Sequence, residues 1–424
     1  MESESKLRIA VVGSGVAGIT AAYLLQRKHT VTLYEKNSYI GGHTHTIVID
    51  GGPDAGTPVD TGFIVFNDRT YPSFRTFLSQ LNVIPAETDM SFSYYCRKTG
   101  FQYGSKDFNM IFAQRRNLLR LSFWHLLLEI VRFNRSTRRR LHEGRLQGIT
   151  LGEYLDREGF GGDIRDEYLI PMAAAIWSTP DAEMLDFPAE SFARFFENHG
   201  LLSTRRHPRW FFIPGGSHKY VTAFVKSFEG RIITGTAVTG VTREKESATV
   251  TLADGTERHF DRVVLATHAD EAFELLSAPS PEESRLLSPW TYSRNRTVLH
   301  TDTSFLPPNR RAWASWNYIR EKDAARESPV TVTYNMNRLQ KLNTEKTYCV
   351  TLNPAHPVSP EHVVAEMEYR HPTFTFDALR TQHGLQELNN SGPVFFCGSY
   401  FGYGFHEDAV VSGLAVAGAF GTPL

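Results

Sequence analysis

The sequence is poor in cysteine and contains no long hydrophobic run. Among 424 residues there are only 3 cysteines, Cys96, Cys349 and Cys397, and they stand far apart. Without a CxxC pair or metal-type spacing, neither a disulfide framework nor a zinc site is indicated, and no metal is expected. No apolar run approaches the roughly 18 to 20 residues of a membrane span. We expect a reducing, cytoplasmic location, and the polar start MESESKLR leaves no room for a cleavable signal.

The chain also lacks an excess of charge of either sign. Its formal net charge is −1, so nothing global indicates a nucleic-acid partner, and none is expected. Locally, acids are scarce: residues 108–140 are expected to be largely helical and contain Glu129 as their only acid beside eight arginines. A basic amphipathic helix at 115–140 suits contact with the inner face of a membrane, and it equally suits the solvated face of a helical subdomain.

The opening stretch, Leu7 to Gly42, organises the rest of the chain. It predicts an apolar strand at Ile9 to Val12, a glycine turn, an apolar helix and a second strand at Thr30 to Tyr34. In the turn, Gly13 permits the sharp bend, Gly15 lets the backbone approach a pyrophosphate, and Gly18 lets helix and strand pack closely. The N-terminus of the helix then offers unpaired N–H groups to phosphates.

An acid ends the second strand, where it can accept both hydroxyls of a ribose. Glu35 follows Gly15 by 20 residues and would repel a 2′-phosphate. The pattern therefore favours an adenosine dinucleotide without that phosphate.

Later segments return to the same kind of unit. Gly215 and Gly216 precede a predicted helix, strands are expected at 231–234, 238–243 and 249–252, and Asp254-Gly255 predicts a hairpin turn. A buried strand is expected at 261–267. Between about 270 and 385 the pattern predicts further strands and a short helix at Glu361 to Tyr369.

The closing stretch, PVFFCGSYFGYGFHEDAVVSGLAVA, reads as an apolar strand, a Gly-aromatic loop and an apolar helix beginning near Glu407. A second helix N-terminus at this end of the chain suits the negative end of a flavin ring, which sharpens the dinucleotide to FAD.

We therefore expect an α/β fold with a discontinuous, Rossmann-type FAD-binding domain formed by residues 1–70, 205–270 and 386–424. Residues 71–204 and 271–385 are expected to form a mixed α+β substrate-binding domain, with a helical subdomain at 108–200. Oligomeric state is left open by the sequence.

With these pieces in place, the chain resembles the superfamily of FAD-dependent amine oxidases, protoporphyrinogen oxidases and phytoene desaturases. The resemblance covers about 150 to 180 residues and is carried by GSGVAG with Glu35, PGGSHKYV, RVVLATHAD and the closing stretch. Within it, GGHTHT, DTGFIVFN and GYGFHED are similar to a bacterial group of FAD/NAD-binding oxidoreductases often associated with cyclopropane-fatty-acid-synthase-like enzymes.

The resemblance implies roles for particular residues. It places the turn glycines at the pyrophosphate, Glu35 at the ribose and the backbone of Val238 at the adenine. The remaining residues it implies at the cofactor are Ala17, Lys36, Gly42, His43, Thr44, Gly398, Phe405, Asp408, Ala409 and Val410. It places Tyr403, Phe405 and His406 toward the substrate.

Three departures set this chain apart from many relatives. His43 stands where many have an arginine, Ser399 and Tyr400 stand where many have an acid, and Arg294 and Arg296 are the only cations where amine oxidases commonly carry a lysine. Amine oxidation of the usual kind is therefore not the first expectation.

The leading hypothesis is a flavoprotein of lipid metabolism, an FAD-dependent dehydrogenase, desaturase or oxidase that moves hydride from an apolar, fatty-acyl or lipid-like substrate to flavin N5. His406, Tyr403 and His43 are the candidate catalytic residues, and His406 or His43 is the candidate base, because an imidazole titrates near working pH. For each histidine a structural hydrogen bond is the alternative role. The alternative functions are an isomerase or mutase without net redox, an amine oxidase, and a non-catalytic lipid-binding escort protein.

Overall fold

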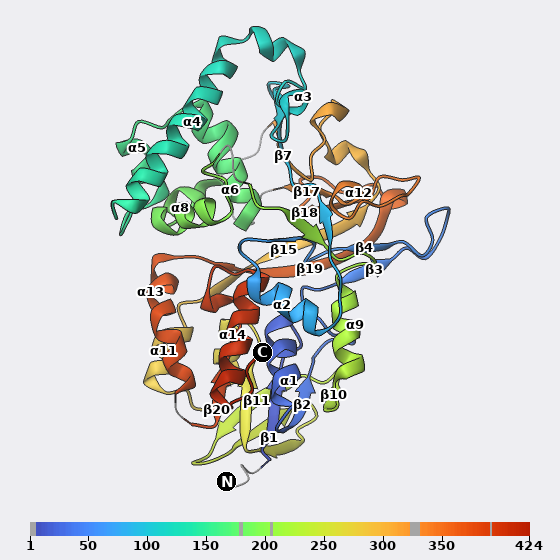
Figure 1. Ribbon diagram of the computed structural model, residues 1–424, viewed down its shortest axis with the longest axis vertical. Coiled ribbons are helices and arrows are strands. Elements are labelled where there is room, and N and C mark those ends of the chain that lie inside the picture. Colours follow the sequence, from blue (N-terminus) through green and yellow to red (C-terminus); the bar gives the residue numbers. More distant parts are fainter. Residues whose placement is uncertain (1–5, 178–180, 204–206, 323–330, 391) are drawn as a thin grey trace.

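The structure is a computed structural model that describes residues 6–177, 181–203, 207–322, 331–390 and 392–424. Figure 1 shows two parts stacked along the long axis, with the long strands β15 and β19 crossing between them. The predicted domain boundary at 204/205 lies outside the described residues. The other predicted boundaries stay a prediction.

A five-stranded parallel sheet forms the centre of the lower part. Its order is β10-β2-β1-β14-β20, so strands from the beginning, middle and end of the chain lie side by side. The strands are nearly continuous apolar runs, as expected where helices cover both faces. Their bounds are β1 Arg8–Val12, β2 Thr30–Tyr34, β10 Arg231–Ile233, β14 Arg262–Leu265 and β20 Val394–Phe396.

Helices α1 (Val16–Leu25) and α14 (His406–Ala419) pack against each other beside this sheet (Figure 1). The contact is close: a Cβ on Gly413 of α14 would lie 2.6 Å from the carbonyl oxygen of Ala17. The two ends of the chain therefore meet. Both helices begin at the edge of the sheet where the parallel strands β1 and β20 end. Helix α9 (His218–Ser227) also contacts α1.

A small antiparallel sheet of β11 (Val238–Arg243), β12 (Ala248–Leu252) and β13 (Glu257–Phe260) adjoins the parallel sheet. The hairpin predicted at Asp254-Gly255 joins β12 to β13, and Gly255 has a φ of +80°. Short strands β3 (Thr46–Val48), β4 (Pro58–Asp60), β5 (Phe66–Asn67), β6 (Ala86–Thr88) and β9 (Trp210–Phe212) form two further small sheets.

A seven-stranded sheet of order β19-β15-β18-β17-β16-β7-β8 forms much of the upper part. Its strands are β7 Phe92–Cys96, β8 Gln102–Gly104, β15 Thr291–His300, β16 Trp316–Arg320, β17 Val332–Asn335, β18 Cys349–Leu352 and β19 Val363–Thr373. Strands β7 and β8 pair as an antiparallel hairpin.

The helix predicted at Glu361 to Tyr369 is wrong. After a short 3-10 turn, this segment is strand β19, paired along its length with β15. Its side chains alternate: Glu366 is exposed, whereas Met367 is half-buried and Tyr369 is buried. The period of two was present in the sequence, and the long antiparallel ladder outweighed the helix propensity of the glutamates.

The helices of the upper part follow β8 in the chain and pack around a core rich in phenylalanine. They are α3 (Phe108–Ile111), α4 (Leu121–His142), α5 (Leu151–Arg157), α6 (Ile170–Trp177), α7 (Asp181–Asp186) and α8 (Ala189–Asn198), with a π-helical turn at Arg165–Leu169. Within the described residues, no helix combines the length and apolar character needed to cross a bilayer.

Five further helices complete the described chain. They are α2 (Pro72–Gln80), α10 (Ala269–Leu275), α11 (Pro281–Leu287), α12 (Met336–Leu339) and α13 (Phe376–Leu385). Helix α2 packs on α14, while α11 and α13 pack on each other.

Candidate functional site

A cavity of about 1960 Å³ runs from the glycine turn after β1 to the helices of the upper part. Cavities that bind one drug-sized ligand measure roughly 300–1,000 Å³. This cavity therefore has room for a large cofactor and a second molecule.

The turn between β1 and α1 forms the lower wall of the cavity. Gly13 has a φ of +99°, and a Cβ on it would lie 2.7 Å from the carbonyl oxygen of Ala266. Gly15 precedes α1 as its N-cap residue and has no side-chain cap, and a Cβ on it would meet nothing within 4 Å. The uncapped N–H groups at the start of α1 are therefore available to an anion.

The acid at the end of β2 is buried and fixed beside this turn. Glu35 is 6% exposed and lines the cavity. One carboxylate oxygen accepts hydrogen bonds from the N–H and hydroxyl of Ser14 (3.1 and 2.6 Å), and the other accepts one from the N–H of Asn37 (2.8 Å). A carboxylate has about four acceptor positions, so one remains for a ligand hydroxyl.

Gly41 and Gly42 form a second glycine turn, which packs directly against the turn between β1 and α1. Gly42 has a φ of +57°, and a Cβ on it would lie 3.1 Å from the Cα of Gly15. The next residue, His43, is half-buried and lines the cavity, and its Nε2 has no hydrogen-bond partner. The backbones of Gly15 and Gly42, which carry no side chains, and the imidazole of His43 thus lie close together at the cavity wall.

Three imidazoles cluster at this point and form what we call the histidine wall: His43, His268 and His371. The ring of His43 lies 6.0 Å from that of His268 and 5.6 Å from that of His371. Tyr292 stacks on His268 at 4.3 Å, and Tyr369 lies 5.1 Å from His43. No group of three or more His, Cys, Asp or Glu side chains in the described ranges is arranged to hold a metal ion.

Burial keeps the histidine wall uncharged. It lowers the pKa of His268 and of His371 to about 3, and the neighbouring imidazoles act in the same direction. Burial also lowers the pKa of His43. At neutral pH these rings can donate and accept hydrogen bonds without carrying charge.

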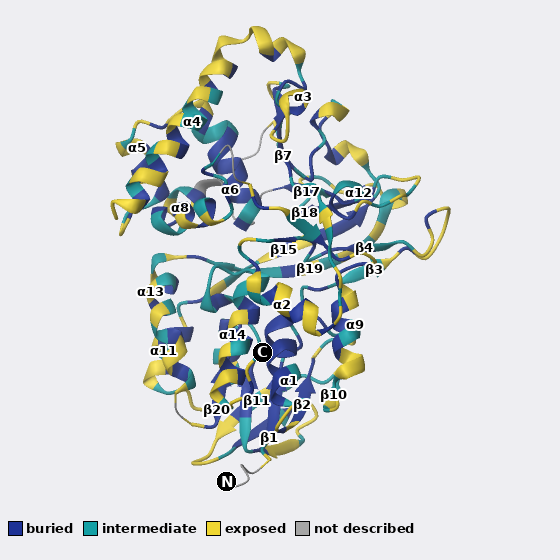
Figure 2. Cartoon of the chain, viewed as in Figure 1, coloured by how far each residue is buried: buried dark blue, intermediate teal, exposed yellow. Residues whose placement is uncertain are grey.

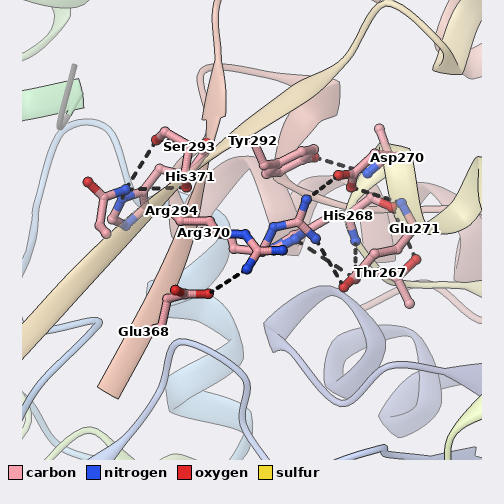
Figure 3. A network of polar contacts seen from close by, with 12 residues as sticks. Thr267, His268, Asp270, Glu271, Tyr292, Ser293, Arg294, Glu368, Arg370 and His371 are labelled. Carbon is pink, nitrogen blue, oxygen red and sulfur yellow. Dashed lines mark hydrogen bonds and ion pairs between the residues drawn. The ribbon is translucent and has the colours of Figure 1, made fainter. Parts of the chain in front are cut away.

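Arg370 supplies the fixed positive charge beside the wall (Figure 3). Its guanidinium pairs with Asp270 and lies 3.4 Å from a carboxylate oxygen of Glu271, which also pairs with Lys36 at 2.8 Å. It also lies over the ring of Tyr292, 5.5 Å from its centre. Asp270 and Glu271, at the start of α10, thus balance the charge of Arg370. These ion pairs hold β19 against α10.

No site role was predicted from the sequence for four residues: His268, His371, Tyr369 and Arg370. Tyr369, Arg370 and His371 lie near the end of β19. Tyr369 is inside the segment predicted to be a helix, and the other two residues follow it directly. The alternation in VVAEMEYRH was the signal that could have identified this strand. His268 stands within the RVVLATHAD motif directly after β14, where side chains at the ends of parallel strands gather.

The C-terminal loop brings Tyr403, Phe405 and His406 to the cavity, with Ala409 behind them. His406 stacks on Phe63 at 3.6 Å and is hydrogen-bonded through Nε2 to the hydroxyl of Tyr220 (2.9 Å). Burial lowers its pKa well below the usual range, so His406 is neutral and already engaged.

Most of the residues implied at the cofactor line the cavity: Gly13, Gly15, Ala17, Glu35, Lys36, Gly42, His43, Val238, Phe405 and Ala409. Five do not reach its wall: Gly18, Thr44, Gly398, Asp408 and Val410. Their cofactor contacts stay a prediction.

These five residues have other packing partners. A Cβ on Gly18 would lie 2.0 Å from the carbonyl oxygen of Gly13, which confirms its close-packing role. The hydroxyls of Thr44 and Tyr220 are 2.5 Å apart, and Asp408 accepts the N–H of Phe405 to cap α14. Val410 is fully buried in the core, and a Cβ on Gly398 would meet the ring of Tyr400 at 2.5 Å.

The upper end of the cavity, here called the apolar chamber, is built from helices. Its lining residues from α3, α4, the π-helical turn, α6 and α8 are Ile111, Leu127, Ile130, Val131, Asn134, Tyr168, Met172, Ile176, Trp177 and Phe195. None of these carries a charge. Asn134 is 8% exposed, and its Oδ1 has no hydrogen-bond partner.

The residues of the lower end fit an FAD molecule. Uncapped helix N–H groups face open space at Gly15, Glu35 keeps an acceptor free, and His43 and His268 line the same cavity. These groups match a pyrophosphate, a ribose and a polar ring edge in turn.

A family model described as "Flavin containing amine oxidoreductase" matches residues 16–419, nearly the whole chain. In sequence, the chain is 32% identical over 98 residues to the 1-hydroxycarotenoid 3,4-desaturase of Flavobacterium sp. (strain P99-3), a match that covers 23% of this chain and 18% of that relative.

Two solved structures share the fold over their full length. A double mutant of putrescine oxidase has a TM-score of 0.71 at 15% identity, covering 98% of this chain and 99% of the other. A CLA-producing fatty acid isomerase from P. acnes has a TM-score of 0.65 at 13% identity, covering 97% and 98%.

Proposed function

The chain belongs to the family of flavin containing amine oxidoreductases and is an FAD-dependent oxidoreductase, and from this premise we propose that its substrate is apolar, a fatty-acyl or lipid-like molecule. The observation that carries the proposal is the apolar chamber, whose ten lining residues from the helices and the π-helical turn carry no charge. An ionised substrate group would lose its hydration there without finding a counter-ion.

The glycine end would hold the cofactor. Gly13 and Gly15 would receive the pyrophosphate at the start of α1, Glu35 the ribose, and His43 the flavin side of the molecule. Bound FAD supplies two-electron redox chemistry, with N5 as the acceptor of hydride from an activated carbon. The aromatic loop at Tyr403 to His406 lies between this end and the apolar chamber, where substrate and ring would meet.

The three candidate catalytic residues would serve different purposes. His406 is stacked and hydrogen-bonded, so it would fix the loop. His43 has an unpartnered Nε2 and a pKa lowered by burial, so it would donate or accept a hydrogen bond rather than act as a strong base. Tyr403, whose pKa is raised by burial, would offer a neutral hydroxyl to the substrate.

Asn134 gives the substrate one polar requirement. Its carboxamide is the only hydrogen-bonding group that α4 contributes to the described chamber lining, and its Oδ1 lacks a protein partner. A buried amide is costly unless it is paired, so the substrate would carry one uncharged polar group at this depth.

The test is to purify the holoprotein, extract its bound ligands for mass spectrometry and add the identified lipid class under anaerobic conditions. We expect yellow flavin that bleaches with a fatty-acyl or other lipid-like compound and not with a diamine. Bleaching by amines alone, or a protein that remains colourless after reconstitution with FAD, would contradict the proposal.

A second candidate, an isomerase without net redox, is favoured by the similarity of fold to the fatty acid isomerase. The two are separated by stoichiometry. Consumption of one electron acceptor per product supports the oxidoreductase that acts on lipid, whereas product formation without acceptor consumption supports the isomerase.

A further inference from the structure

The segment from Phe108 to Leu128, here called the tip, presents apolar side chains to solvent. The exposed fraction is 62% for Phe108, 90% for Leu119, 86% for Leu121 and 68% for Leu128. The tip is the upper extreme of the molecule in Figure 1, and Figure 2 shows it largely as exposed surface. Exposed apolar side chains gathered on one segment in this way mark an interaction site.

The exposed side chains are held in place. Leu121, Trp124 and Leu128 follow one stripe of α4, while Phe123 and Leu126 on the opposite stripe are buried. The indole N–H of Trp124 donates to the carbonyl of Leu118 (3.0 Å), and its ring lies 5.3 Å from that of Phe112. The patch therefore has a fixed conformation, and its side chains stay exposed because they do not pack into the core.

The tip is also positively charged. It contains Arg115, Arg116 and Arg120 and no aspartate or glutamate. Arg115 donates to the carbonyl of Phe112 and to Asn109, and Arg120 lies over the ring of Phe101. Within the described ranges, none of these three arginines forms an ion pair with a carboxylate.

The other end of the basic segment behaves differently. Arg138 pairs with Glu197 at 3.1 Å, and Arg140 pairs with Glu158 at 2.8 Å. The structure thus divides the basic range 115–140 into a tip with unbalanced charge and a C-terminal half whose charges are largely balanced within the protein.

The tip adjoins the cavity. Ile111 and Leu127 line the apolar chamber from the same segment, and the exposed Ser105 and Lys106 line the cavity just before Phe108. One side of α4 therefore faces the chamber and the other carries the exposed patch.

We propose that the tip docks on the surface of an anionic lipid bilayer and that substrate passes from the bilayer into the adjoining chamber. Leucines and a tryptophan suit the acyl and headgroup depths, and unpaired arginines suit anionic headgroups. A second copy of the chain is a poorer occupant, because it would bring two sets of unpaired arginines together. The route of the substrate rests on the proposed function, whereas docking does not require turnover.

The test is sedimentation of the flavin-loaded, full-length protein with vesicles of phosphatidylcholine alone and of phosphatidylcholine with phosphatidylglycerol. We expect binding to the anionic vesicles that is at least about tenfold tighter than binding to the neutral ones. The double variant L119E/L121E should weaken it about tenfold or more. I84E is the matched control, because Ile84 is 83% exposed outside the tip, and it should bind as the wild type does.

A second pair of variants separates the two basic clusters. Replacing Arg115, Arg116 and Arg120 by Ala should weaken vesicle binding, and replacing Arg138, Arg139 and Arg140 by Ala should leave it nearly unchanged. Equal binding to both kinds of vesicle, equal loss in I84E, or a dimer in solution that L119E/L121E dissociates would overturn the proposal. Flavin bleaching in detergent is measured on the same samples: its absence with vesicle binding intact would overturn the proposed substrate and leave docking standing.

Discussion

The two ends of the cavity are built in different ways. The glycine end offers main-chain N–H groups, one buried carboxylate and neutral imidazoles, and its turn residues lie within a few positions of one another. The apolar chamber offers side chains from four helices and a π-helical turn, and these ten side chains are uncharged. Backbone recognition depends on the absence of Cβ atoms, whereas a side-chain lining depends on volume. The glycine end is therefore intolerant of substitution, and the apolar chamber sets substrate specificity.

The strongest way to break this comparison is to add a side chain at the glycine end. Gly15→Val places a branched side chain in open space that the cofactor would occupy, so the fold should survive while flavin is lost. Two hydrogen bonds to a charged group, each worth about 1.5–3 kcal/mol, correspond to a loss of about a hundredfold or more in affinity. Flavin absorbance after dialysis against FAD measures it.

Gly51→Val is the control, because a Cβ on Gly51 also meets nothing within 4 Å but lies away from the cavity. Full flavin content in Gly15→Val would mean that this backbone does not contact the cofactor.

The histidine wall should make the glycine end sensitive to acid. The pKa of His371 falls from about 6.5 to about 3 on burial, so below pH 6.5 the unfolded chain binds a proton that the folded chain does not. Stability contributed by the neutral ring is thus lost as pH falls. Between pH 7 and pH 5, the free energy of unfolding should therefore fall by roughly 2 kcal/mol less in His371→Gln than in the wild type.

Urea unfolding of both proteins at the two pH values gives this difference, with His383→Gln, an exposed site on α13, as the control. The same pH dependence in His371→Gln and wild type would refute a neutral buried His371.

Removing the charge of Glu35 sharpens the comparison at a single side chain. Glu35→Gln keeps the shape but loses a charged acceptor for the ribose, so affinity for FAD should fall about tenfold. Fluorescence titration of the apoprotein measures it. Glu274→Gln is the matched control, because Glu274 lines the cavity and is exposed; an equal fall in both variants would point to general electrostatics instead of a specific contact.

The smallest expected effect lies in the apolar chamber. Asn134→Leu removes a buried amide oxygen that has no partner, so the ligand-free protein should become more stable by about 1 kcal/mol while flavin content is unchanged. Thermal unfolding followed by circular dichroism detects the shift. Asn198→Leu, at an exposed position on α8, should show no gain, and flavin loss in Asn134→Leu would break the separation of the two ends.

The nucleotide-binding half was largely predictable. Strand, glycine turn, helix and acid from Arg8 to Glu35 are local in sequence, and each element has the predicted type and nearly the predicted bounds. The closing helix, expected near Glu407, begins at His406. Short-range signals suffice there because turn chemistry and hydrophobic period determine the conformation within one unit.

The site as a whole was less predictable. β19 was taken for a helix, so Tyr369, Arg370 and His371 had no assigned position until β15 paired with them. His406 was an attractive base in the sequence, but its stacking on Phe63 and hydrogen bond to Tyr220 depend on residues more than 180 positions away. Burial and pairing across such separations leave no local signal.

By itself, the sequence determined that this protein carries a dinucleotide-binding unit and that its two ends belong to one cofactor site. Glycines, a strand-ending acid and an apolar closing helix are enough, because phosphate recognition by backbone depends on local geometry. Only the tertiary structure decided which histidines share a wall, that Oδ1 of Asn134 is left without a partner, and that the arginines of the tip, unlike those after Arg135, form no ion pair within the described residues. Those properties arise when distant elements remove water from, or leave it around, a particular side chain.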